Sequence, residues 1–496
     1  MDTLSSPDDE DRPAVETPVR ELVAVERGEV ADDRTREQPD AHCGLRAHAT
    51  LRAPVRDVRR PHEQPVEAAL PDDTLLGPRG PRRPRGSPAS TASRALLKES
   101  PHVLFSWRYT RDAAEARRTF IRHRQFRGAV EFPPFELLHW FEGTEEGFLH
   151  ISHSEMLGFR FHEFGRELPN LNLGEASPRG TPKLRSLIGA QHQVWPEQVL
   201  VCNGASEGNF LVQAALLNPG DEAIAEVPLY PPMRDSLVGL SATVKRVHRL
   251  AAEDWRLDFD ELERAITAKT KLLVLTNLNN PTAAMLTSQD LKRIGDLADA
   301  HGFYVHVDET FRELGFEQSP PTAVTFSPRF VITSTLTKVF GLGGLRLGWV
   351  VGSPDVIEKV KSVKDYTSIC PSRVSEEIAM WALERKDGFV ARAKRITKAN
   401  REVVRAWLAR NPNVSCFLPD YGNMCFPKVP VSADELADRL KERSKVVIAP
   451  GRFFGMNEHF RLGYGEHHAN LERGLDYVDS AIKGLARRSK RARHES

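Results

Sequence analysis

Residues 330–352 contain the pattern that most restricts how this chain can fold. An apolar, β-branched run is followed by a glycine-rich bend and a second apolar run, which predicts strand, exposed turn and strand. Lys338 lies between the two runs, where a charged amine costs free energy unless its charge is used or suppressed. A lysine with a lowered pKa is the usual nucleophile toward an aldehyde. With Thr335 before it and Arg346 beyond the bend, Lys338 suits an aldehyde cofactor that carries a phosphate.

Asp308 ends another apolar run, residues 303–308. A carboxylate at the carboxyl end of a parallel strand lies where α/β sheets bind ligands. Paired with a ring nitrogen, it would keep that nitrogen protonated and make the ring an electron sink. An aspartate that merely caps the following helix is the alternative interpretation.

Three further turns carry candidate ligand contacts. Residues 199–216 read as strand, turn and helix, and the helix start at Ser206 predicts an anion site or an ordinary capped helix. Tyr230 lies beside two prolines, where its ring would stack on a flat ligand or simply pack. Asn280 and Pro281 end the buried strand that starts at residue 271 and form a common turn.

The segment from Thr335 to Lys338, followed by Arg346, resembles the pyridoxal-phosphate lysine signature of the class I and II aminotransferases, the fold-type I enzymes. The resemblance continues from residue 168 to about residue 480. It implies an α/β fold, with a mostly parallel seven-stranded sheet in a large domain and an α+β small domain. The stretch at 133–141 resembles the N-terminal arm of the aspartate-aminotransferase-like branch that includes capreomycidine synthase.

The resemblance implies pyridoxal 5′-phosphate as cofactor and Lys338 as the residue that holds it in an internal aldimine. It assigns cofactor contacts to Ala205, Ser206, Glu207, Tyr230, Asn280, Asp308, Thr335, Lys338 and Arg346. Catalysis falls to Lys338 and Asp308, and Arg461 is the candidate for the substrate α-carboxylate, because arginine offers a rigid bidentate fork. An arginine paired with Glu458 on the surface is the alternative.

Three positions depart from the family pattern. Glu175 stands where a tyrosine usually reaches the neighbouring subunit's cofactor phosphate, Ala283 replaces a glycine after Asn280, and Phe311 replaces a tyrosine. These replacements favour a divergent member of the family.

The implied function is an aminotransferase acting on L-amino acids and 2-oxo acids as a homodimer. A lyase or cyclase of secondary metabolism with the same cofactor is the alternative, since the cofactor supplies the electron sink in both. A regulator with an aminotransferase-like domain behind a DNA-binding helix pair is disfavoured, because residues 1–98 show no apolar helical periodicity.

Composition limits the partners and the compartment. A net charge of +1 does not indicate nucleic acid or a membrane surface. Five cysteines without a CxxC pair do not indicate a disulfide framework or a zinc site, and the acidic N-terminus lacks the apolar core of a signal peptide. We therefore expect a cytoplasmic protein. His150 and His153 read as a possible metal pair or, more simply, as two loop histidines.

Composition also divides the chain. Residues 1–98 are rich in Pro, Arg and acidic residues and read as disordered, while residues 106–126 have helical periodicity. We expect a disordered extension at 1–98, an N-terminal arm with part of the small domain at 99–179, a large cofactor-binding domain at 180–360, a C-terminal small domain at 361–485 and a basic tail at 486–496.

Overall fold

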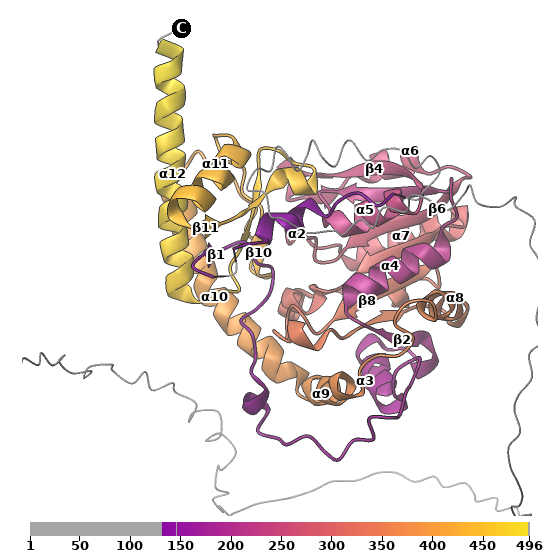
Figure 1. Cartoon of the computed structure of the whole chain (residues 1–496). Helices are drawn as coiled ribbons and strands as arrows, with labels where there is room; N and C mark the ends of the chain where they lie inside the picture. The colour runs from indigo at the N-terminus through magenta and orange to yellow at the C-terminus, as the bar shows by residue number, and fades with distance from the viewer. Residues whose placement is uncertain (1–130, 145, 495–496) are drawn as a thin grey trace, which may run out of the picture. The chain divides into compact units, whose positions relative to one another are not determined.

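A computed structural model describes residues 131–144 and 146–494, with side chains described up to residue 488. An eight-stranded sheet is its largest feature (Figure 1). In spatial order the strands are β2 (Val199–Cys202), β9 (Gly348–Val351), β8 (Phe330–Thr335), β7 (Tyr304–Asp308), β6 (Thr270–Thr276), β3 (Glu222–Val227), β4 (Thr243–Leu250) and β5 (Arg256–Leu257).

The sheet confirms the expected mostly parallel architecture. β3, β4, β6, β7 and β8 pair in parallel, whereas β9 is antiparallel to both β8 and β2. The predicted number of seven strands was one too few, because β5 adds two residues antiparallel to the end of β4 at the sheet edge. The predicted strand, turn and strand around Lys338 are β8, the bend and β9.

Helices cover both faces of the sheet because its strands are apolar on both sides. In β2, for example, Val199 and Val201 pack into one core while Leu200 and Cys202 pack into another, as the alternation of a strand requires. The helices around the sheet are α3 (Pro182–His192), α4 (Ala205–Leu216), α5 (Pro231–Gly239), α6 (Phe259–Ala265), α7 (Ser288–His301), α8 (Pro354–Lys364) and α9 (Arg373–Glu384). Leu211 of α4 packs on the face that Leu200 occupies.

The C-terminal part of the chain is α+β and has its own apolar core, which includes Trp407 and Leu475. Its elements are α10 (Lys386–Arg410), β10 (Met424–Cys425), α11 (Ala433–Arg439), β11 (Val446–Val447), β12 (Ala449–Pro450), β13 (Phe460–Gly463) and α12 (His468–His494). β10, β13 and β12 form an antiparallel sheet. The N-terminal segment contributes the helix α2 (Glu136–Phe141) and β1 (Leu149–His150), which pairs with β11.

Short helices complete the described chain. They are η2 (Phe161–Phe164), η3 (Pro196–Gln198), η4 (Ala251–Glu253), η5 (Arg312–Gln318), η6 (Ala323–Thr325), η7 (Gly343–Leu345), η8 (Leu440–Ser444) and η9 (Gly451–Phe454). In the part of the chain that the structure describes, no helix has the length and apolar character needed to cross a membrane. The expectations for residues 1–98 and 106–126 lie outside the described residues, and the predicted domain boundaries stay a prediction.

Candidate active site

The sheet topology brings most of the predicted site residues to the carboxyl ends of the parallel strands. Asp308 ends β7, Asn280 lies in the turn after β6, Tyr230 follows β3, and Lys338 follows β8. Because these four strands are parallel, their carboxyl ends meet at the same edge, where α/β sheets bind ligands. α4 begins beside this edge, at Ala205, after β2.

Asp308 is buried, and its carboxylate is held by neighbouring polar groups. Its Oδ2 accepts a hydrogen bond from Asn209 Nδ2 at 2.8 Å, and its Oδ1 accepts one from the Thr310 backbone N–H at 2.9 Å. Asn209 Oδ1 in turn accepts from the hydroxyl of Thr333 at 2.5 Å. Burial raises the pKa of Asp308, and these hydrogen bonds oppose the rise. A cationic ring nitrogen beside this carboxylate would supply the counter-charge that burial demands.

The start of α4 forms a cradle for an anion. Gly208 makes the first helical hydrogen bond, to the Gly204 carbonyl, so the N–H groups of Ala205 and Ser206 precede the helical ladder. Arg346 lies against this turn, because a Cβ on Gly204 would come within 2.6 Å of Arg346 Nη2. The guanidinium donates to the carbonyl of Gly343 at 3.1 Å and is exposed, which leaves other N–H groups of the fork for a phosphate.

The side chains of Glu207 and Thr335 bond to the protein's own backbone near this cradle, which residue type alone did not indicate. Glu207 Oε2 accepts from the backbone N–H of Asn203, in the turn before α4, at 2.5 Å, so its carboxylate is engaged there and only its N–H group suits an anion. Thr335 is buried, and its hydroxyl donates to the carbonyl of Leu347 at 2.8 Å, which joins β8 to the segment before β9.

Lys338 faces a carboxylate from the N-terminal segment. Its Nζ lies 3.1 Å from Glu155 Oε1, and the lysine side chain is 22% exposed. Burial lowers the pKa of Lys338 below its usual value, and the Glu155 charge opposes this shift. A neutral amine, the nucleophilic form, is therefore more accessible here than on a surface lysine.

Arg461 on β13 is buried beside the same edge of the main sheet. Its Nη1 donates to Asn280 Oδ1 at 3.0 Å and its Nε donates to the Ser152 carbonyl at 3.1 Å. Burial lowers the pKa of Arg461 to about 10. The alternative of a surface pair with Glu458 is wrong, because Glu458 pairs with Lys428 at 2.6 Å. The remaining N–H donors of Arg461 suit a planar carboxylate.

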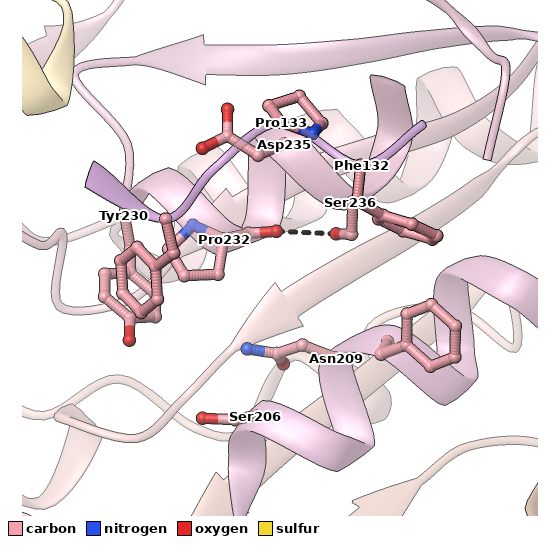
Figure 2. Close-up of a pocket in the computed structure, with 10 residues that line it drawn as sticks. Phe132, Pro133, Ser206, Asn209, Tyr230, Pro232, Asp235 and Ser236 are labelled. Atoms are coloured by element: carbon pink, nitrogen blue, oxygen red, sulfur yellow. Dashed lines mark hydrogen bonds between the residues drawn. The ribbon is translucent and has the colours of Figure 1, made fainter. Parts of the chain in front are cut away.

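Tyr230 borders a cavity of ≈ 210 Å³. Figure 2 shows Ser206 and Asn209 of α4 on one side of this cavity and Tyr230 with Pro232 on the other. Burial raises the pKa of Tyr230 to about 12, with the Arg461 charge opposing the rise. The rings of Phe135 and Tyr230 meet in a T-shaped contact with 5.9 Å between centroids, so the N-terminal segment packs against the tyrosine ring.

The three departures from the family pattern have different surroundings. Glu175 is exposed in a loop, where its Oε1 accepts from Asn172 at 3.4 Å. Ala283 adopts a left-handed φ of 62°, the conformation that the expected glycine adopts without strain. Phe311 is buried, 4% exposed, and belongs to the main core.

Sequence reasoning missed Glu155, Asn209 and Thr333. Asn209 lies one helical turn after Ser206 on α4, so the helical period was the available signal. Glu155 gave no signal, because its partner Lys338 is 183 positions away. His150 and His153 stack at 4.4 Å between ring centroids, and the described residues contain no group of three ligand side chains around a metal position.

These residues fit pyridoxal phosphate by their chemistry. The N–H groups at the start of α4 and Arg346 suit a phosphate, Asp308 suits a pyridine nitrogen, and Lys338 suits an aldehyde. Because Gly204 has no Cβ, the Arg346 guanidinium can lie against the start of α4.

Comparisons with known proteins give the following matches. The family model described as "Aminotransferase class I and II" matches residues 175–478. Capreomycidine synthase of Streptomyces vinaceus is 28% identical over 334 residues, which span 66% of this chain and 85% of that protein. Aspartate/prephenate aminotransferase of Thermus thermophilus is 28% identical over 319 residues, or 61% of this chain and 81% of that protein. A solved PLP-dependent aminotransferase from Streptococcus suis has a TM-score of 0.67 at 25% identity and covers 72% of this chain and 99% of its own.

Proposed function

The chain belongs to the class I and II aminotransferases, which depend on pyridoxal 5′-phosphate, and from this premise we propose that it transfers the amino group of an L-amino acid with Lys338 as the cofactor-binding lysine. One observation carries the proposal. Asp308 ends β7, Lys338 lies in the bend after β8, and Arg461 lies on β13, and all three lie at the carboxyl ends of the parallel strands. They supply an amine, a carboxylate and a guanidinium at a single site.

Pyridoxal phosphate, when bound, supplies an electron sink for the charge left on the substrate Cα. Lys338 has two tasks around it. Its amine is the nucleophile for the cofactor aldehyde, and burial favours the neutral form that can attack. The neutral Nζ would also be the base that accepts the proton from the substrate Cα.

The other residues bind and orient. Asp308 holds a proton on the ring nitrogen, and Asn209 and the Thr310 N–H group fix the direction of its carboxylate. Arg461 grips the substrate α-carboxylate with the donors that Asn280 and Ser152 do not use. The α4 cradle, which consists of Ala205, Ser206, the Glu207 N–H group and Arg346, holds the phosphate. The Thr335 hydroxyl donates to the carbonyl of Leu347, the residue after Arg346, and so supports the bend that carries this arginine.

Borohydride reduction followed by peptide mapping tests the assignment of Lys338. We expect the cofactor to be fixed to Lys338, and Lys338→Ala to abolish turnover without unfolding the protein. Lys364 is the matched control, since burial lowers its pKa too, but its Nζ donates to the Pro178 carbonyl at 3.0 Å. An adduct on Lys364 or any other lysine would overturn the assignment.

A cyclising or eliminating enzyme is the second candidate, and the similarity to capreomycidine synthase over 85% of that protein favours it. Only a transaminase needs a 2-oxo acid to return the cofactor to its aldehyde form. We expect an L-amino acid to change the absorbance of the bound cofactor and a 2-oxo acid to restore it. A product formed without any such exchange would select the second candidate.

The family relationship also supports a homodimer, which stays part of the proposal. Light scattering at micromolar concentration measures the mass of the active species. A fully active monomer would contradict the homodimer.

A further inference from the structure

The segment from Ile151 to Phe159 runs between the lysine bend and β13. On one side, the Met156 N–H group donates to the Lys338 carbonyl at 3.1 Å. On the other side, the Leu157 N–H group donates to the Gly465 carbonyl at 3.1 Å. The segment therefore has backbone partners from both the main sheet and the C-terminal part, and its position is set by both.

Two glycines allow this close approach. A Cβ on Gly341 would lie 2.4 Å from the Leu157 carbonyl oxygen, and a Cβ on Gly465 would lie 2.4 Å from the Glu155 carbonyl oxygen. Any other residue at either position would push the segment away from the lysine. Glu155 is therefore held in register with Lys338 by backbone packing.

The Glu155 side chain enters the site as a charged group. Its Oε1 lies 3.1 Å from Lys338 Nζ, and 46% of the side chain is exposed, so a ligand can reach the carboxylate. Burial alone would raise the pKa of Glu155, but the charge and hydrogen bond of Lys338, together with smaller contributions from His153 and Arg461, outweigh burial and lower it. His153 does not supply a second positive charge, because burial lowers its pKa to about 4.

The proposed function changes the partner of this carboxylate. Lys338 loses its free ammonium when it binds the cofactor, Arg461 is committed to the substrate α-carboxylate, and Asp308 is committed to the ring nitrogen. Arg346 stays with the phosphate at α4. Glu155 then lacks the Lys338 ammonium, which lies 3.1 Å away in this structure, and Arg461 is the remaining described cation that lowers its pKa. A partly buried carboxylate in that state favours a cationic ligand group.

We propose that Glu155 is a specificity-determining residue that selects an L-amino acid with a cationic side chain and disfavours aspartate and glutamate. The proposal rests on the aminotransferase function proposed above. In this proposal, Arg461 binds the α-carboxylate of the substrate and Glu155 contacts the end of its side chain. A dicarboxylic substrate would place its second carboxylate beside Glu155, where like charges repel.

Ligands that lack an α-amine test the proposal without turnover. We would titrate the cofactor-loaded protein with 4-guanidinobutanoate, pentanoate and pentanedioate by calorimetry. Each has one carboxylate for Arg461, and the other end is cationic, neutral or anionic. A guanidinium does not react with an aldehyde as a primary amine would, and it pairs with a carboxylate through two hydrogen bonds. We expect 4-guanidinobutanoate to bind about tenfold more tightly than pentanoate, and pentanedioate to bind most weakly.

Two variants of Glu155 separate charge from packing. Glu155→Gln keeps the shape and should bring the affinities for 4-guanidinobutanoate and pentanoate within about twofold of each other. Glu155→Asp keeps the charge and should retain the preferred order. Glu142→Gln removes an exposed carboxylate next to α2 and should leave the order and the ratios unchanged.

Equal affinities in the wild-type protein, or a preference for 4-guanidinobutanoate that survives in Glu155→Gln, would overturn the proposal. If either of these outcomes is found while L-amino acids still change the absorbance of the bound cofactor, only the role of Glu155 is overturned and the aminotransferase function stands. If no L-amino acid changes the absorbance, the proposed function fails instead, while the calorimetry still reports the charge preference of the site.

Discussion

Phe311 stands where the family resemblance expects a tyrosine whose hydroxyl stabilises the anionic ring oxygen of the cofactor. Phenylalanine has no donor, and one hydrogen bond to a charged group contributes about 1.5–3 kcal/mol, or about one to two pKa units. We expect Phe311→Tyr to lower the pH at which the absorbance of the bound cofactor changes. The measurement is a pH titration of that absorbance in both proteins.

Asn280 provides the control for this prediction, since it is the other donor that the resemblance assigns to the ring oxygen. Asn280→Ala should move the same midpoint to higher pH. An unchanged or higher midpoint in Phe311→Tyr would show that the residue does not face the ring oxygen, or that another donor occupies its place.

The turn between β2 and α4 depends on Gly204, which has φ 84° and ψ 165°, a conformation available almost only to glycine. A Cβ there would meet Arg346 Nη2 at 2.6 Å. We expect Gly204→Ala to weaken cofactor binding by about tenfold or more, because the loss of one charged hydrogen bond costs about 1.5–3 kcal/mol. Titration of the cofactor-free protein with pyridoxal phosphate measures this.

Gly302→Ala is the matched control. Gly302 has a φ of 74° and no atom within 4 Å of an added Cβ, so the substitution strains the backbone without crowding a neighbour. It should cost about 1–2 kcal/mol of stability and leave cofactor affinity unchanged. Equal affinity losses in both variants would contradict a specific role for Gly204.

The turn that carries Asn280 rests on a buried ion pair between β3 and β4. Glu226 accepts from Arg249 Nε at 2.5 Å, from the Thr276 N–H group at 2.6 Å and from Asn279 Nδ2 at 3.0 Å. Arg249→Met leaves Glu226 buried and without its counter-charge. We expect a loss of about 3–5 kcal/mol in the free energy of unfolding, measured by urea denaturation.

A second substitution tests this explanation. Glu226→Gln in the Arg249→Met background removes the buried charge and should recover part of the loss, since the penalty comes from the unpaired carboxylate. No recovery would indicate that the packing of the Arg249 side chain, and not its charge, stabilises the turn.

At the level of the whole described fold, acid stability depends on buried neutral histidines. Burial lowers the pKa of His306 to about 3, while its unfolded value is about 6.5. Between these pH values His306 binds a proton in the unfolded chain but not in the folded chain. The stabilisation is therefore complete above pH 6.5 and is lost as the pH falls toward 3.

We expect the free energy of unfolding to fall with decreasing pH over this window, with His306 contributing up to about 1.4 kcal/mol per pH unit. His306→Gln should reduce that slope in urea denaturation at pH 6.5 to 4. His301→Gln, at an exposed position, controls for the substitution itself. An identical slope in His306→Gln and wild type would contradict the assignment.

The strands, turns and helix start that carry the candidate site residues could be predicted from local sequence. Lys338 between two apolar runs, Asp308 at the end of another and the helix start at Ser206 each depend on neighbours within a few positions, and strand, turn and helix periods are local properties. The mostly parallel order of the strands was implied by the family resemblance. The resemblance implied seven strands, whereas the sheet has eight, because the two-residue strand β5 is added beside β4.

Tertiary packing decided which distant groups share the site. Glu155 meets Lys338 across 183 positions and Arg461 meets Asn280 across 181, and neither pair has a sequence pattern. Packing also brought the Glu207 carboxylate to the Asn203 N–H group and the Thr335 hydroxyl to the Leu347 carbonyl. Residue type and hydrophobic periodicity indicate which chemistry a side chain can perform. Its partner depends on which segments the folded backbone brings within hydrogen-bond distance.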